Sequence, residues 1–217
     1  MKGNLKWLLL IPVFAVAISL GYLIPTLLLS DDSGDENTST TKAQSQVLQS
    51  QLDDINQRIT AYQALLQRNP NDIDAMKGIG DSYLEMGAYQ GEAGEVNESY
   101  RSYKNAVDQY RKYLSIKPDG VETRIDLGLA YSYLQMIDIS LRELNAATAA
   151  DPANQRGWHS LGWVLYNSAG NVTDARVAWQ KSYDLNPNTP IGVESKTFLD
   201  QFTTSQISVP QASGIEP

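Results

Sequence analysis

The sequence contains no cysteine and only one histidine, His159. The absence of cysteine excludes disulfide bonds, thiolate zinc sites, cysteine nucleophiles and a lipid-modified N-terminal cysteine. A single histidine makes a poor transition-metal site. The sequence also lacks HExxH, GxSxG, P-loop and glycine-rich dinucleotide-binding motifs. We therefore expect no enzymatic activity, no cofactor and no bound metal.

Positive charge is scarce, because 17 lysine and arginine residues stand against 25 acidic residues and give a formal net charge of -8. Nucleic-acid binding needs a basic face that replaces the counterions of the phosphates, so this charge balance argues against it. The hydrophobic share of 42% and the charged share of 19% are typical of a chain that folds around a core. We therefore expect protein partners and no nucleic acid.

Charged residues are also absent from Trp7–Leu29, a run of 23 mostly apolar residues. As a helix this run would be roughly 35 Å long, which is enough to cross a hydrocarbon core of about 30 Å. Lys2 and Lys6 precede it and favour a cytoplasmic N-terminus. Residues 1–30 are thus predicted to be a single-pass membrane anchor, with the rest of the chain periplasmic or otherwise extracytoplasmic. The alternative is a cleaved signal peptide, since Ala15–Ala17 resembles a small-residue cleavage site.

Polar residues fill 31–45, which the composition predicts to be a flexible tether. A heptad pattern follows on a predicted helix over 46–69. Its apolar positions, spaced alternately four and three apart, are Leu48, Leu52, Ile55, Ile59, Tyr62 and Leu66. This seam has two interpretations: the helix packs on the domain behind it, or it forms a homodimer through Leu48–Leu66.

Four proline-containing turns divide the rest of the chain. They are NPND from Asn69, KPDG from Lys117, DPAN from Asp151 and NPNT from Asn186. Their prolines are 48, 34 and 35 residues apart, and each follows an amphipathic helical stretch. A proline just after a helix stops it and starts a turn. The spacing therefore predicts three repeats of paired helices.

Specific residues recur within these repeats in the order W-x2-L-G-x2-Y, A-x3-F and P. The matching positions are Met76, Ile79, Gly80, Tyr83, Ala106, Tyr110 and Pro118 in the first repeat; Arg124, Leu127, Gly128, Tyr131, Ser140, Leu144 and Pro152 in the second; and Trp158, Leu161, Gly162, Leu165, Ala175, Trp179 and Pro187 in the third. The sequence thus resembles tetratricopeptide repeat proteins over 46–202. This resemblance implies an all-α solenoid of three repeats over 70–202, with flanking helices.

The first repeat is longer than the others by 14 residues, Ala88–Arg101. This insertion either projects as a loop or adds turns to both helices. After the last repeat, Thr189 as N-cap and Pro190 at the first helical position predict a capping helix over 189–202. Residues 203–217 are predicted to be a disordered tail.

The resemblance implies a protein-binding groove, because the first helix of each tetratricopeptide repeat lines the concave surface. The inner-face positions are Lys77, Asp81, Leu84 and Glu85 in the first repeat; Ile125, Asp126, Leu129 and Tyr133 in the second; and His159, Trp163 and Tyr166 in the third. Such a groove is acidic at one end and aromatic and aliphatic at the other. It suits a partly basic peptide or amphipathic helix. The alternative is that the capping helix covers Trp163.

These features together predict a non-enzymatic, membrane-anchored scaffold or assembly factor that binds a protein partner outside the cytoplasmic membrane. The arrangement of anchor, helix and exported repeats resembles the repeat subunits of cytochrome c maturation systems. It also resembles envelope proteins that partner periplasmic chaperones. The alternative function is that of a permanent structural or accessory subunit in a larger membrane protein complex.

Overall fold

A computed structural model describes residues 36–204 of the chain, and its side chains over 45–202. The described residues form the helices α2 (Glu36–Arg68), α3 (Ile73–Glu92), α4 (Val96–Ile116), α5 (Val121–Tyr133), α6 (Ile137–Ala150), α7 (Gln155–Asn167), α8 (Val172–Leu185) and α9 (Pro190–Thr204). They divide into two compact units, one that ends at Glu143 and one that begins at Leu144. Each unit is considered separately below.

The predicted anchor Trp7–Leu29 lies outside the described residues, as does most of the predicted tail 203–217. The first two residues of that tail, 203 and 204, are helical and end α9. Within residues 36–204, no helix has the length and apolar character needed to cross a lipid bilayer.

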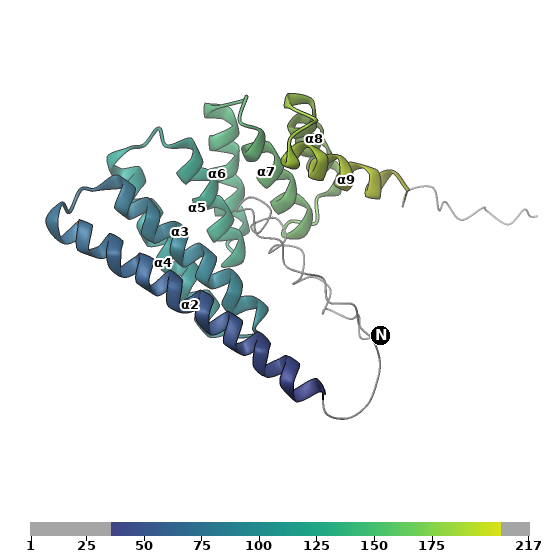
Figure 1. The fold of residues 1–217 in the computed structure, drawn as a ribbon. Coiled ribbons are helices and arrows are strands. Elements are labelled where there is room, and N and C mark those ends of the chain that lie inside the picture. The colour runs from purple at the N-terminus through teal and green to yellow at the C-terminus, as the bar shows by residue number, and fades with distance from the viewer. Residues whose placement is uncertain (1–35, 205–217) are drawn as a thin grey trace, which may run out of the picture. The chain divides into compact units, whose positions relative to one another are not determined.

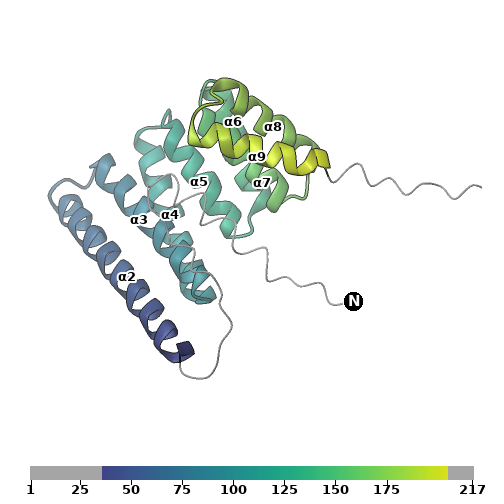
Figure 2. The ribbon, with the colours of Figure 1, turned by 45° about the vertical axis from the view of Figure 1, so that its right-hand side comes forward.

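In the first unit, α2 lies alongside α3, and α3 and α4 form an antiparallel hairpin (Figures 1 and 2). The heptad seam of α2 faces α3. Its central residues Ile55 and Ile59 are 1% and 5% exposed and pack with Ile79 and Met86 of α3. Of the two interpretations of the seam, packing within the chain is the one observed, and homodimerisation is not shown.

Helix α2 begins at Glu36, ten residues before the predicted start. Residues 36–45, predicted from their polarity to be a tether, are therefore helical. The prediction relied on an apolar stripe, which this segment lacks. A helix that is already nucleated needs only one backbone hydrogen bond for each added residue. No proline or glycine in 36–45 interrupts that extension.

The insertion in the first repeat lengthens both of its helices. α3 has 20 residues against 13 in α5 and α7, and α4 has 21 against 14 in α6 and α8. Seven residues, about two helical turns, are thus added to each helix. The helices are joined by a short turn in which Gly94 has φ +80, a conformation that favours glycine.

The fourth residue of each proline turn starts the next helix. The side chains of Asp72 and Asn154 accept hydrogen bonds from the backbone N–H groups three residues on, at 2.9 and 2.8 Å. Thr189 Oγ1 accepts one from the Gly192 N–H at 3.0 Å at the start of α9. Gly120 occupies this position before α5 and offers no side-chain cap. These local bonds satisfy backbone donors that a helix start would otherwise leave unpaired.

At the first position of the repeat pattern, arginine and tryptophan make the same kind of hydrogen bond to the preceding turn. Arg124 Nη2 donates to the carbonyl oxygen of Pro118 at 2.9 Å, and Trp158 Nε1 donates to that of Pro152 at 2.9 Å. Both side chains therefore tie a helix to the proline turn six residues upstream. Position 124 carries arginine where the repeat pattern has tryptophan, but the hydrogen bond to the proline turn is still formed.

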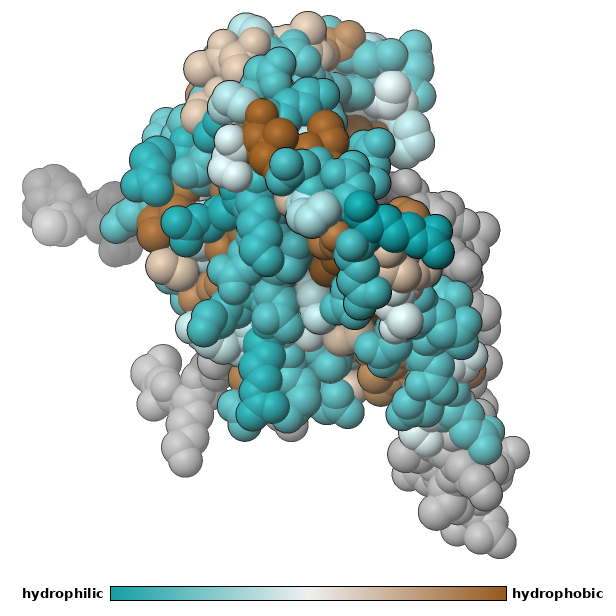
Figure 3. Space-filling view, turned by 90° about the vertical axis from the view of Figure 1, so that its left-hand side faces the viewer, coloured by the Kyte–Doolittle hydropathy of each residue, from teal (hydrophilic) through white to brown (hydrophobic). Residues whose placement is uncertain are grey.

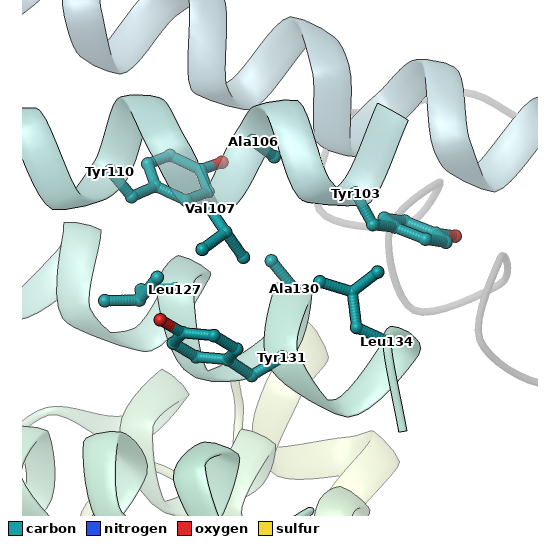
Figure 4. Packing of buried hydrophobic residues seen from close by; sticks show 8 residues of the cluster. All are labelled: Tyr103, Ala106, Val107, Tyr110, Leu127, Ala130, Tyr131 and Leu134. Atoms are coloured by element: carbon teal, nitrogen blue, oxygen red, sulfur yellow. The ribbon is translucent and has the colours of Figure 1, made fainter. Parts of the chain in front are cut away.

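Figure 4 shows the contact between α4 and α5 that joins the first two repeats. Eight buried residues pack together here: Tyr103, Ala106, Val107 and Tyr110 of α4, Leu127, Ala130 and Tyr131 of α5, and Leu134 directly after the end of α5. Each of the eight is at most 9% exposed. Successive repeats in this unit thus share one apolar core, as stacked repeats require.

In the second unit, α7 and α8 form a hairpin and α9 packs on α8. The indole of Trp179 is fully buried and stacks on Phe198 of α9, with ring centroids 4.6 Å apart. Phe202 lies on the same indole at 5.8 Å. α9 therefore caps the last repeat through aromatic contacts.

Candidate protein-binding site

Three of the predicted groove residues form a charge cluster in the first unit. Lys77 Nζ of α3 donates to Asp81 Oδ2 at 2.7 Å and to Asp126 Oδ2 of α5 at 3.3 Å. The hydroxyl of Tyr110 also donates to Asp81, at 2.9 Å. The side chain of Asp126 is only 7% exposed, whereas those of Lys77 and Asp81 are 31% and 46% exposed. The cluster therefore joins the first helices of two repeats and presents Lys77 and Asp81 to solvent.

The charged groups of this cluster shift the pKa values of Lys77 and Asp81. Burial alone lowers the pKa of Lys77, but the carboxylates of Asp126 and Asp81 raise it above its ordinary value. Burial and the negative charge of Asp126 raise the pKa of Asp81, against the hydrogen bonds from Lys77 and Tyr110. One ammonium group thus faces two carboxyl groups. A second cation supplied by a partner would relieve the repulsion between them.

Two other predicted groove residues of the first unit serve the fold instead. Glu85 accepts a hydrogen bond from Arg58 Nη2 of α2 at 2.6 Å, so it faces the preceding helix. Ile125 is fully buried. The sequence placed both on the inner face, but helical spacing fixes only their angular position and not which neighbour occupies that side.

Apolar groove candidates in the first unit lie near its core. Leu84 and Tyr133 are partly buried against the cluster between α4 and α5. The ring of Tyr133 stacks on Tyr103 at 4.5 Å. Leu129 is partly exposed. Because Asp126, Leu129 and Tyr133 are three and four residues apart, they share one face of α5.

In the second unit, the capping helix α9 contacts two of the third-repeat candidates. His159 and Trp163 are each 7% exposed. The ring of His159 lies 6.0 Å from that of Phe198, and Tyr166 lies 4.6 Å from Phe202. His159 and Tyr166 therefore pack against α9 and do not line an open groove, which corrects the prediction. The repeat pattern predicts where these residues lie on α7, but it does not predict the angle at which the capping helix packs.

His159 belongs to a buried polar chain that the sequence did not reveal. Its Nδ1 lies 2.9 Å from Ser195 Oγ, which donates to Ser182 Oγ at 2.9 Å. Its Nε2 lies 3.5 Å from Glu194 Oε2. Ser182 of α8 and Ser195 of α9 stand among the apolar positions of two helices that face each other. A serine at such a position is the signal in the sequence that could have identified them.

Burial, assisted by the positive charge of Arg156, lowers the pKa of His159 to about 4. Burial also raises the pKa of Glu194. The imidazole is therefore neutral at pH 7, and the contact with Glu194 is not an ion pair between two full charges. Serine, histidine and a carboxyl group meet here, but Ser195 is fully buried and no substrate can reach its hydroxyl. This arrangement holds α9 in place and does not form an active site.

Comparison with known families agrees with this architecture. A family model described as a tetratricopeptide repeat matches residues 59–121 and 125–190, together more than half of the chain. The chain belongs to the tetratricopeptide repeat family. A search of the curated proteins found no match to this tetratricopeptide protein.

Several solved structures are similar in fold to this tetratricopeptide protein. A crystal structure of MamA is 18% identical, with a TM-score of 0.47, and the match covers 82% of this chain and 97% of that chain. The Sgt2 TPR domain from Aspergillus fumigatus is 20% identical, with a TM-score of 0.47 and coverage of 63% and 88%. The first TPR domain of human RPAP3 is 17% identical, with a TM-score of 0.44 and coverage of 60% and 98%.

Membership of this family gives a general function. Tetratricopeptide domains are interaction modules that stack helical pairs into a surface for other proteins, and they are generally scaffolds or adaptors rather than enzymes. The fold therefore indicates protein–protein interaction.

Proposed function

We propose that this chain is a membrane-anchored tetratricopeptide scaffold or assembly factor that binds a protein partner outside the cytoplasmic membrane. The observation that carries the proposal is the charge cluster of Lys77, Asp81 and Asp126. It joins the first helices of two successive repeats. In this family the first helices of the repeats line the concave groove, which supports the proposal. Assembly of cytochrome c or cooperation with a periplasmic chaperone would be two instances of such a role.

The cluster and its neighbours define the partner's chemistry. A lysine or arginine of the partner would pair with Asp81, which is the more exposed of the two carboxyl groups. Leu129 and Tyr133 continue the Asp126 face of α5 and supply an apolar contact beside this charge. The partner segment is therefore a peptide or amphipathic helix that is basic in part and apolar in part.

Photo-crosslinking in native membranes tests the binding site. A photo-reactive residue at Leu129 is expected to capture a discrete protein. A control probe at Lys104, which is exposed on α4, is expected not to capture it. Asp81→Asn should reduce the capture, whereas Asp108→Asn on the exposed side of α4 should not. Equal capture by both probes, or capture that is indifferent to Asp81→Asn, would refute the groove.

The anchor is supported by the uncharged run Trp7–Leu29. Tethering raises the effective concentration of the domain near a membrane-bound partner, so a weak groove affinity would suffice. The test is extraction of native membranes with alkaline carbonate. A chain that stays in the membrane pellet supports the anchor, and a chain that is released into the supernatant refutes it.

The second candidate function is a permanent subunit of a membrane complex. Figure 3 shows a mainly hydrophilic face on which hydrophobic side chains form small, separate patches. Permanent interfaces are larger and more apolar, so this face favours a partner that binds and leaves. Co-purification that survives both high salt and detergent would instead support the permanent subunit.

A further inference from the structure

We propose that the end of the α3–α4 hairpin is a second docking surface, separate from the groove, for a basic amphipathic helix of a partner protein. This hairpin tip comprises residues 92–101, in the turn between the helices and the first turns of α4. It lies in the two extra turns that the first repeat adds to each helix.

The hairpin tip adds little to the apolar core, because Ser99 is the one buried residue among residues 92–101. The two helices approach each other through small side chains. Ser99 Oγ donates to the Gly87 carbonyl oxygen at 2.7 Å, and Ser102 Oγ donates to Gln90 Oε1 at 2.7 Å. A Cβ added at Gly91 would meet Ser99 Oγ at 3.2 Å. Large apolar residues in the tip are therefore not used to hold the hairpin together.

Two large apolar side chains of the tip face solvent. Val96 and Tyr100 are 72% and 55% exposed, and their spacing of four places them on one face of α4. Tyrosine combines apolar area with a polar end and is common at binding hot spots. A rigid helix that presents both residues provides a preorganised contact for an apolar stripe.

Acidic residues surround this apolar pair. Glu92, Glu95 and Glu98 are all exposed. Arg101 lies 3.9 Å from Glu98, and within residues 36–204 neither Glu92 nor Glu95 forms an ion pair. The tip therefore complements lysine or arginine on either side of an apolar stripe. An anionic lipid surface would be repelled, which favours a protein partner over a membrane.

The experiment uses the full-length chain in detergent, with a photo-reactive residue at Asn97, between Val96 and Tyr100. A matched control probe stands at Thr173 on α8, next to the similarly exposed Val177. The binding probes are an 18-residue amphipathic peptide of leucine and lysine, and its counterpart in which glutamate replaces lysine. Capture of the leucine–lysine peptide at Asn97, but not at Thr173, and no capture of the leucine–glutamate peptide are expected.

Two sets of variants make the result specific. Val96→Ser with Tyr100→Ser should weaken capture at Asn97 by about fivefold, equivalent to roughly 1 kcal/mol. Both side chains are exposed, so the unfolding midpoint should stay unchanged, which separates lost binding from lost folding. Asp81→Asn should leave capture at Asn97 intact, because the tip and the groove are separate. This variant distinguishes failure of the tip from failure of the groove.

Several outcomes would overturn the proposal. These are equal capture at Asn97 and Thr173, capture of both peptides alike, and capture that persists in the Val96→Ser, Tyr100→Ser variant. Loss of capture in Asp81→Asn would also overturn it, because the peptide would then occupy the groove. Crosslinking of Asn97 to phosphatidylglycerol vesicles in preference to the leucine–lysine peptide would assign the tip to a membrane.

Discussion

Gly162 of α7 lies directly against the indole of Trp179 of α8 in the third repeat. A Cβ at this position would lie 2.6 Å from both Cδ1 and Nε1 of Trp179. An ordinary carbon contact is about 3.5 Å, so the indole would have to move by about 0.9 Å. It has no room to do so, because Trp179 is fully buried and stacks on Phe198 at 4.6 Å.

The sign of the stability change in Gly162→Ala therefore depends on whether the indole can move. Replacing a helical glycine by alanine stabilises a helix by about 1 kcal/mol when the new methyl group meets open space. Overpacking a rigid core costs about 1–3 kcal/mol. We expect a net loss of about 1 kcal/mol in the free energy of unfolding. Gly91→Ala is the control, since its Cβ would lie 3.2 Å from Ser99 Oγ and so needs a much smaller shift, and we expect a smaller loss there than at Gly162.

Urea unfolding of the full-length chain measures this change, followed by circular dichroism for both variants and also by tryptophan fluorescence for Gly162→Ala. Three of the four tryptophans, Trp158, Trp163 and Trp179, lie in the second unit and report on it. In a double-mutant cycle, Trp179→Phe should relieve part of the clash and so couple favourably to Gly162→Ala. A Gly162→Ala variant more stable than the wild type by about 1 kcal/mol, or the absence of coupling, would refute the close-packing argument.

Two further predictions concern the helices at the ends of the repeats. Ile55→Ala should lower the free energy of unfolding by about 2–5 kcal/mol, because Ile55 is 1% exposed, whereas Leu65→Ala, at 42% exposure, should change it by less than about 0.5 kcal/mol. Urea unfolding followed by circular dichroism compares the two, and similar losses would contradict the packing of α2 on α3. Burial lowers the pKa of His159 from 6.5 to about 4. Between pH 6.5 and about pH 4 the unfolded chain therefore binds a proton that the folded chain does not, so the free energy of unfolding should fall as the pH is lowered through this range. The raised pKa of Glu194 has the opposite effect on stability as the pH falls. His159→Gln should remove the part of the pH dependence of stability that comes from the histidine. An unchanged pH profile in His159→Gln would show that His159 is not the cause.

Local features of this fold could be predicted from the sequence because their physics is local. The proline turns, the caps at Asp72, Asn154 and Thr189, and the start of α9 all depend on residues within one helical turn. The 34-residue spacing could also be predicted, since each repeat needs a neighbour to bury its apolar face. Turn chemistry and repeat period together therefore specified an all-helical repeat fold.

Parts of the candidate binding surface depended on contacts between distant residues. Glu85 belongs to the inner-face pattern of α3, yet Arg58, 27 residues away, holds it against α2. The insertion Ala88–Arg101 was equally compatible with a loop. It continues both helices, which pack side by side where glycines without a side chain on α3 meet the small Ser99 side chain of α4.

The capping helix shows the same division between local pattern and tertiary contact. Thr189 and Pro190 marked where α9 begins, and Phe198 and Phe202 marked its apolar face. The sequence alone thus determined the repeats, their turns and the presence of a cap. Only the tertiary structure decided that, in the second unit, this cap packs on His159 and Tyr166. In the first unit, it decided that Lys77 and Asp81 keep part of their side chains exposed to solvent. The physical reason is that periodicity states which side of a helix is buried, while the packing of complementary side chains determines what it is buried against.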